Sequence, residues 1–210
     1  MKLIVFGATG TIGRHVVRAA LEAGHEVTAF ARTVSGFGAD FSPLGGALSL
    51  RQGDVLNAES VAAAIPGHDA VVVTLGAGAR SGLRAPGTAK IANAMQAAGV
   101  RRLIALSTLG AGDSRAQLNF FWKHVMFGML LRRALADHEA QEALIRASDT
   151  DWTIVRPAAF TDDPETEEMF HGDLSGKELS LKVPRANVGR FIVGELASAR
   201  YLHQAPGLSC

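Results

Sequence analysis

Short apolar runs alternate with longer stretches of helical periodicity along almost the whole chain. The runs LIVF, HEVTAF, LSLRQGDV, DAVVVTL, RRLIALST and DWTIVRP each have the length of a strand. DAVVVTL is continuously apolar and rich in β-branched residues, which is typical of a strand covered on both faces in a parallel sheet. We therefore expect strands at residues 3–6, 25–30, 48–55, 69–75, 101–108 and 151–157.

The stretches between these runs predict helices, because glycine or proline follows several of them. Gly24, Gly67 and Gly99 stand where the first three would end. We expect helices at about residues 11–23, 58–65, 86–98, 116–147 and 185–201, with a break near Gly128 left open. Residues 33–47 and 158–177 predict loops. The run ELSLKV, residues 178–183, predicts a short last strand.

This alternation of strands and helices indicates an α/β protein. Right-handed crossovers would place the strands in a mainly parallel, doubly wound sheet with helices on both faces. No linker, repeat or low-complexity tract divides the 210 residues. We therefore expect a single domain that spans residues 1–210.

Composition and charge narrow the class of protein. Apolar residues make up 48% and charged residues 20%, and the net charge of +1 gives no field that would recruit nucleic acid or a membrane. Cys210 is the single cysteine, which favours a reducing compartment, and the seven histidines show no metal-ligand spacing. No signal-peptide pattern and no apolar run of spanning length is present. We expect a cytoplasmic protein without metal, nucleic-acid or membrane partners, either a monomer or a homodimer.

The sequence GATGTIG follows the first strand and opens an amphipathic helix. Its spacing, G-x-x-G-x-x-G, is one residue longer than the standard dinucleotide fingerprint, but the same physical roles apply. Gly7 lets the chain leave the strand, Gly10 keeps bulk away from a diphosphate, and Gly13 lets the helix lie close to the sheet. This context favours a dinucleotide site of Rossmann type over a plain tight turn. The expected cradle comprises Gly7, Thr9, Gly10, Thr11, Ile12 and Gly13.

The end of the second strand distinguishes between the two nicotinamide dinucleotides. A carboxylate at this position would hold the ribose 2′-hydroxyl and repel a 2′-phosphate. The sequence instead places Arg32 there, and a guanidinium offers a planar fork for phosphate. Arg14 is a second candidate, and a solvated surface arginine is the alternative for both. NADP(H) is therefore the expected cofactor.

With these residues, the chain resembles the extended and atypical short-chain dehydrogenases/reductases. Within them it is similar to the NAD(P)H-binding, NmrA-like proteins and to biliverdin reductase B, the flavin reductase. The matching segments include VFGATGTIG, QGDVLN, DAVVVTLGAG, GVRRLIALST and HEAQEALIRASDTDWTIVRP. The resemblance implies cofactor contacts at four strand ends: Asp54 and Val55 at the adenine, Leu75 and Gly76 along the ribose, Ser107 and Thr108 near the nicotinamide, and Pro157 in the nicotinamide pocket.

The chain lacks the Tyr-x-x-x-Lys pair that most reductases of this superfamily use. Its one tyrosine is Tyr201, and residue 205 is alanine. Alignment on the segment that ends in DWTIVRP places Ala134 at the tyrosine position and His138 at the lysine position. The usual proton transfer by a tyrosine is therefore excluded.

The flavin and biliverdin reductases imply a different arrangement, with a hydroxyl at the end of the fifth strand and a histidine on the next helix. Here these are Thr108, with Ser107 beside it, and His138. A histidine titrates near neutral pH and can supply a proton or a hydrogen bond. Glu142, four residues along, is within reach to orient it, although such a pair can also be a plain surface feature. His124 and His171 are lesser candidates.

The aromatic stretch 118–131, LNFFWKHVMFGMLL, is the main candidate for substrate specificity. It fits core packing, an apolar cap over the nicotinamide, or a dimer face. We expect a substrate pocket formed by about residues 110–140 and 157–180.

Two functions from different classes follow. The first is an NADPH-dependent oxidoreductase that reduces a flat conjugated acceptor, such as a flavin, quinone or bilin. The second is a non-catalytic NADP(H)-binding sensor of NmrA type, which reports redox state to a protein partner. A nucleotide-sugar isomerase or epimerase is disfavoured, because those enzymes usually keep the tyrosine.

Overall fold

All six strongly apolar runs form strands, and these strands lie in one sheet. The computed structural model of the chain describes residues 1–44, 47–76 and 82–210. In this part of the chain, the sheet has eight strands in the order β3-β2-β1-β4-β5-β6-β10-β8, all parallel except β8, which runs antiparallel to β10. The strands are β1 (Lys2–Phe6), β2 (Glu26–Ala31), β3 (Leu48–Gln52), β4 (Ala70–Val73), β5 (Arg102–Leu106), β6 (Asp151–Pro157), β8 (Phe170–Gly172) and β10 (Gly207–Ser209).

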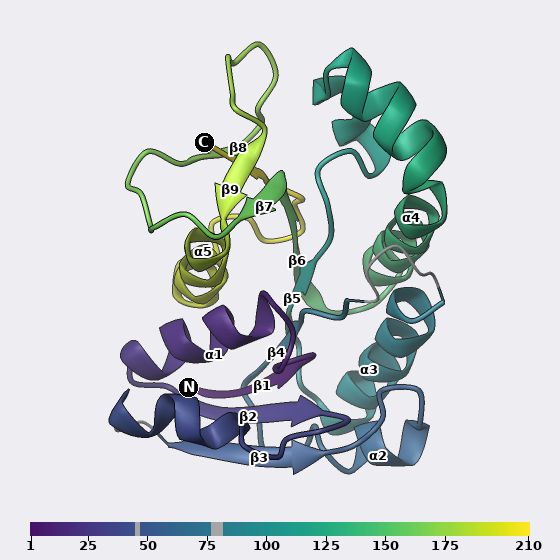
Figure 1. Cartoon of the computed structure of the whole chain (residues 1–210). Helices are drawn as coiled ribbons and strands as arrows, with labels where there is room; N and C mark the ends of the chain where they lie inside the picture. Colours follow the sequence, from purple (N-terminus) through teal and green to yellow (C-terminus); the bar gives the residue numbers. More distant parts are fainter. Residues whose placement is uncertain (45–46, 77–81) are drawn as a thin grey trace.

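Helices cover both faces of this sheet (Figure 1). On one face α1 (Gly13–Glu22) and α5 (Arg185–Ser198) share a core with β1 and β2. On the other face α2 (Ala58–Ala62), α3 (Arg84–Ala98) and α4 (Arg132–Arg146) contribute to a second core. Every residue of β4 is buried, as expected for a strand between two helical layers. The expected doubly wound, mainly parallel α/β fold is confirmed.

The turn after β1 lies where the strand order reverses. β1 has β2 on one side and β4 on the other. The connections that leave the carboxyl ends of β1 and β4 therefore run in opposite directions, and such a switch point leaves a crevice at the strand ends. Gly7 has a φ of 84°, and a Cβ there would lie 2.7 Å from the carbonyl oxygen of Thr74. A Cβ on Gly13 would overlap the carbonyl oxygen of Gly7. The first and third glycines are therefore required by the turn itself.

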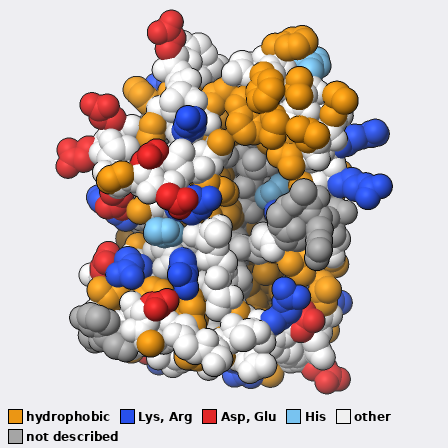
Figure 2. Space-filling view, viewed as in Figure 1, with side chains coloured by type: hydrophobic (Ala, Val, Ile, Leu, Met, Phe, Trp, Pro, Cys, Tyr) orange, Lys and Arg blue, Asp and Glu red, His pale blue; other side chains and the backbone are white. Residues whose placement is uncertain are grey.

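The region between β5 and α4 differs from the long helical region expected at about residues 116–147. A 3₁₀-helix, η2 (Gly112–Gln117), is followed by a π-helix, η3 (Phe121–Leu130), and then by α4. The break falls at Leu131, with φ −110° and ψ 14°, whereas Gly128 lies inside the π-helix. Figure 2 shows apolar side chains gathered at the upper right, where this segment lies in Figure 1. The exposed apolar residues of this segment are Phe120, Phe121, Met129 and Leu130.

Two stretches expected to be loops contain short regular elements. Within residues 33–47 the chain forms a 3₁₀-helix, η1 (Phe37–Leu44), and residues 45–46 lie outside the described part. After β6, the strand β7 (Ala159–Thr161) pairs with β9 (Lys182–Pro184) in a separate two-stranded sheet. Elements of three residues are too short for a hydrophobic period to reveal them.

The C-terminal segment corrects the expected closing helix. Helix α5 ends at Ser198, because Ala199 takes a left-handed conformation with a φ of 47°. The chain then returns along the sheet, and β10 pairs with β6 in parallel. All three residues of β10 are buried, so this segment extends the sheet beyond the expected closing helix, where the sequence predicted no strand.

Candidate active site

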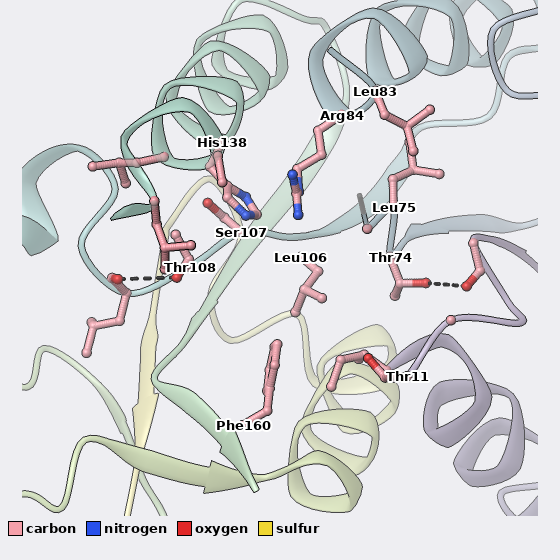
Figure 3. A pocket seen from close by; sticks show the side chains of 18 of the residues that line it. Thr11, Thr74, Leu75, Leu83, Arg84, Leu106, Ser107, Thr108, His138 and Phe160 are labelled. Carbon is pink, nitrogen blue, oxygen red and sulfur yellow. Dashed lines mark hydrogen bonds between the residues drawn. The ribbon is translucent and has the colours of Figure 1, made fainter. Parts of the chain in front are cut away.

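A pocket of about 720 Å³ opens at the carboxyl ends of β1, β2, β4 and β5. Its volume lies within the range of small-molecule sites, roughly 300–1,000 Å³. One half, which we call the glycine half, is lined from the glycine turn and from the ends of β2, β3 and β4. The other half, which we call the apolar half, is lined by side chains from residues 83–84, 106–138 and 158–181 (Figure 3).

Most of the residues predicted from the sequence line this pocket. In the glycine half they are Gly7, Thr9, Gly10, Thr11, Ile12, Arg32, Asp54, Val55, Leu75 and Gly76. In the apolar half they are Ser107, Thr108 and His138.

Three predicted residues lie outside the pocket wall. Gly13 packs against the turn rather than facing the pocket. The guanidinium of Arg14 forms an ion pair with Asp40 at 3.2 Å, because η1 brings that carboxylate over α1. Pro157 is buried at the end of β6, where its carbonyl oxygen accepts a hydrogen bond from the Leu109 N–H at 2.8 Å. The next residues along the chain, 158–160, line the pocket instead.

The glycine half fits the diphosphate of a dinucleotide. Helix α1 begins at Gly13 with no side chain capping its N-terminus and no acidic residue in its first turn. Uncapped N–H groups and the helix dipole favour an anion at this point. The hydroxyl of Thr74 donates to the Phe6 carbonyl oxygen at 3.1 Å, which ties the ends of β1 and β4 together beside the turn. Arg32 is exposed at the pocket wall and has no hydrogen bond or ion pair among the described residues.

Glu142 does not orient His138, contrary to the expectation from their i, i+4 spacing. Its carboxylate instead accepts hydrogen bonds from the Ser107 hydroxyl at 2.6 Å and from Arg156 at 2.9 Å (Nε) and 2.6 Å (Nη2). Arg156 lies inside the sheet with 1% of its surface exposed, and a buried cation requires such a partner. The Ser107 hydroxyl is therefore fixed by this network. The hydroxyl of Thr108 makes a single long bond, to the Leu109 carbonyl oxygen at 3.3 Å.

His138 is half-buried in the wall of the apolar half, with its Nδ1 shielded from solvent. Desolvation and, to a smaller extent, the nearby cation of Arg84 together lower its pKa to about 3, against the opposing effect of Asp137. The expectation that His138 titrates near neutral pH is therefore wrong. Its Nδ1 has no hydrogen-bond partner among the described residues. A neutral imidazole can orient a bound molecule through a hydrogen bond, but it holds no extra proton to donate.

Burial of His138 predicts an acid sensitivity of the folded state. Unfolding restores the pKa to its ordinary value of 6.5, so between pH 6.5 and about 3 the unfolded chain binds a proton that the folded chain does not. His138 should therefore lower the free energy of unfolding as pH falls below 6.5, by at most about 1.4 kcal/mol per pH unit from this one group. His138→Gln should make this decrease shallower, as measured by urea unfolding at pH 7 and pH 5. The exposed His124→Gln is the control, and an equally steep decrease in both variants would contradict a neutral, half-buried imidazole.

Arg84 is a pocket residue that the sequence did not single out. It is the first residue of α3, it lines the apolar half, and only 6% of its surface is exposed. Its position shortly after β4, at the same edge of the sheet as the glycine turn, is the signal that could have identified it.

The aromatic stretch 118–131 divides between the pocket and the molecular surface. Leu118, Trp122, Phe127 and Leu131 line the apolar half, and the rings of Trp122 and Phe127 lie 5.9 Å apart. The opposite side of η3 carries the exposed residues named above. Part of this stretch is therefore pocket wall, with a second apolar face directed outward.

The remaining candidates from the sequence lie away from the pocket. His124 packs on Phe120, with ring centroids 4.6 Å apart, and His171 shares a hydrogen bond with the hydroxyl of Tyr201 at 2.7 Å. In the described ranges, no three histidine, cysteine, aspartate or glutamate side chains come together as a metal site would require. Of the helices described, none is both long enough and apolar enough to cross a bilayer.

The fold and the pocket together define a dinucleotide-binding protein of the doubly wound class. Residues 7–199 match the model of the NAD(P)H-binding family, and the chain belongs to that family. A UPF0659 protein from Schizosaccharomyces pombe is 29% identical over 90% of this chain and 82% of its own length. Sterol demethylase protein B from Methylococcus capsulatus is 34% identical over 76% of this chain, which spans about half of that relative (51%).

Solved structures agree with this assignment. ChuY from Escherichia coli O157:H7, described as an anaerobilin reductase, is 25% identical and has a TM-score of 0.78, with 99% of this chain and 96% of that chain covered. A short-chain dehydrogenase/reductase from Veillonella parvula in complex with NADP has a TM-score of 0.81 at 18% identity, with 99% and 93% covered. The resemblance to atypical short-chain dehydrogenases/reductases is confirmed, and the NAD(P)H-binding family agrees with the expectation of a nicotinamide dinucleotide as cofactor.

Proposed function

We propose that this protein is an NADPH-dependent oxidoreductase that transfers a hydride to a flat conjugated acceptor, such as a flavin, a quinone or a bilin. The observation that carries the proposal is the continuity of the pocket. An apolar half with aromatic walls adjoins a glycine half that fits a dinucleotide, so a flat molecule bound there would face the cofactor. The reductase ChuY, with the same fold and 25% identity, supports an acceptor of this kind.

The residues of the two halves have distinct roles in this proposal. The glycine turn and the N-terminus of α1 hold the diphosphate, Arg32 holds the 2′-phosphate, and the ends of β3 and β4 hold the adenine and ribose. When bound, NADPH supplies the hydride. Thr108 positions the reacting groups with its hydroxyl, and His138 does so as a neutral hydrogen-bonding group. The apolar walls exclude water, and a proton reaches the reduced acceptor from solvent rather than from a tyrosine.

NADPH oxidation tests this function directly. Purified protein is mixed with NADPH and, in separate assays, menadione, riboflavin and biliverdin, and the absorbance of NADPH is followed. At least one acceptor should accelerate NADPH oxidation well beyond the rate without protein. If NADPH binds and no acceptor has this effect, the proposed activity is wrong.

One observation favours the second candidate, an NADP(H)-binding sensor of NmrA type. The outward face of η3 exposes large apolar residues, with Phe120 and Met129 each 75% exposed, and such faces often serve protein partners. Binding of NADPH without turnover of any acceptor would support this alternative over the oxidoreductase.

Arg32→Ala should change the choice of cofactor. Loss of a charge-assisted contact to the 2′-phosphate should weaken NADPH binding about 10- to 100-fold and leave NADH within about twofold. Cofactor titrations followed by fluorescence measure both affinities. Arg14→Ala is the matched control, because Arg14 is paired with Asp40 outside the pocket wall, and it should change neither affinity. Equal losses for both cofactors in Arg32→Ala would contradict the 2′-phosphate role.

A further inference from the structure

Arg84 places a permanent cation in the wall of the largely apolar half of the pocket. Its guanidinium is directed into the pocket beside His138 and Ser107 (Figure 3). Among the described residues that line the apolar half, it is the one charged side chain. Burial lowers the pKa of Arg84, but a guanidinium still remains protonated at any physiological pH. Such a charge is costly to bury unless a partner compensates it.

Asp137 compensates this cation only in part. Its carboxylate accepts hydrogen bonds from the backbone N–H groups of Arg84 and Ala85, each at 3.2 Å, and so caps the N-terminus of α3. The guanidinium approaches the same carboxylate through Nη1 alone, at 3.5 Å. The Arg84 Nε is shielded from the pocket and has no hydrogen-bond partner in the described chain, whereas Nη2, which is not shielded, has no partner there either. The guanidinium therefore retains donors for a bound molecule.

Among the residues that the structure describes, no other group of the apolar half neutralises Arg84. His138 lies close enough for the cation to lower its pKa, and its imidazole is neutral. The carboxylate of Glu142 is held by Ser107 and Arg156. The remaining described walls are mainly aliphatic and aromatic. A molecule that enters the apolar half thus meets one positive charge in surroundings of low polarity, where its effect is strong.

The proposed reaction creates a negative charge in the apolar half. A neutral conjugated acceptor that takes up a hydride gains two electrons and one proton, while NADPH becomes NADP⁺. The acceptor is then an anion, with its charge delocalised onto a conjugated carbonyl oxygen until a proton from water neutralises it. A fixed donor aimed at such an oxygen is an effective form of electrostatic catalysis.

We propose that Arg84 is a further catalytic residue, which binds the conjugated carbonyl oxygen of the acceptor and stabilises the negative charge that hydride transfer leaves there. This inference rests on the proposed oxidoreductase function and defines its substrate class. The preferred acceptors carry a carbonyl oxygen in conjugation with the atom that receives the hydride. Cationic dyes, which become neutral when they take up a hydride, gain no benefit from Arg84.

Two acceptors and two variants test this role. With menadione, Arg84→Gln should lower kcat about 100-fold, the usual effect of removing an oxyanion donor. With methylene blue, a cationic dye, kcat should not fall, once the rate without protein is subtracted. Arg84→Lys keeps the charge and should recover part of the activity with menadione. Lys90→Gln on the same helix lies outside the pocket wall and should behave as the wild type.

Binding measurements keep this role separate from folding and from cofactor binding. NADPH affinity, titrated by fluorescence, should be the same in Arg84→Gln as in the wild type. Weaker NADPH binding would assign Arg84 to the cofactor, and equal losses with menadione and methylene blue would assign it to the fold. Either result overturns the proposal, as does an unchanged rate with menadione.

A further measurement separates a failure of this inference from a failure of the proposed function. 2-Hydroxy-1,4-naphthoquinone is an anion at neutral pH, and its binding to the protein–NADP⁺ complex needs no turnover. We expect Arg84→Gln to weaken this binding at least about tenfold, in line with loss of a hydrogen bond to a charged group. If none of the acceptors accelerates NADPH oxidation by the wild type, the oxidoreductase function fails. The affinity for 2-hydroxy-1,4-naphthoquinone still decides whether Arg84 forms an oxyanion site. Equal binding to both proteins would refute that site.

Discussion

Gly13→Ala should both destabilise the protein and weaken its binding of NADPH. A Cβ at this position would overlap the Gly7 carbonyl oxygen and crowd the backbone of Ala8, neither of which can rotate away. The N-terminus of α1 would have to move from the glycine turn, at a cost of about 1–3 kcal/mol for forced overpacking. Since that N-terminus is the proposed diphosphate site, NADPH affinity should fall at least about tenfold.

Gly194→Ala provides the matched control for this change. Gly194 lies within α5, and a Cβ there would meet nothing within 4 Å. Alanine should therefore stabilise that helix by up to about 1 kcal/mol and leave NADPH binding unchanged. Denaturant unfolding and fluorescence titration measure both quantities. A Gly13→Ala protein with wild-type stability and NADPH affinity would contradict the close packing of α1 on the turn.

Glu142→Ala should produce the largest loss of stability among these variants, about 3–5 kcal/mol. The carboxylate accepts two hydrogen bonds from Arg156 and one from Ser107, all of them buried. Without it, the one acidic partner left to Arg156 in the described part of the chain is Asp113, at 2.7 Å, whose side chain is 82% exposed. A cation inside the sheet would then be left with one partner at the surface.

A neighbouring glutamate on the same helix separates this effect from a general effect of charge. Glu139 is exposed, and its one hydrogen bond is long, at 3.4 Å from the Gly112 N–H. Glu139→Ala should therefore change the free energy of unfolding by about 0.5 kcal/mol or less. Urea unfolding of the two variants at pH 7 measures the difference. Similar stabilities would show that the buried network contributes little.

The parts of the fold that could be predicted are those encoded by local patterns. Continuous β-branched runs such as that of β4 indicated buried parallel strands, and the GATGTIG turn indicated the switch point. The strand β10 could not be predicted, because three residues become a strand only by pairing with β6. The π-helix η3 could not be predicted for a related reason. Its composition is that of a helix, and the sequence carries no signal for the wider winding or for the break at Leu131.

The residues of the candidate site likewise divide into those that local patterns could predict and those that they could not. Residues at strand ends, such as Arg32 and Thr108, could be located because parallel strands bring their carboxyl ends to one edge of the sheet. The environment of His138 could not be read from its spacing to Glu142. That carboxylate is taken by Arg156 from a distant strand, and burial removes the imidazole's titration from the neutral range. Arg84 was missed because its importance lies in its burial and its incomplete pairing with Asp137.

The central claim is that the pocket holds NADPH and passes its hydride to a flat acceptor. Single-turnover oxidation of bound NADPH, deuterated at one or the other C4 position, tests this claim most directly. We expect an acceptor such as menadione to oxidise the bound cofactor. Deuterium at one of the two positions should slow that oxidation, because a nicotinamide held at the proposed site would present one face to the acceptor. Bound NADPH that no flavin, quinone or bilin oxidises, or oxidation that neither label slows, would contradict the account.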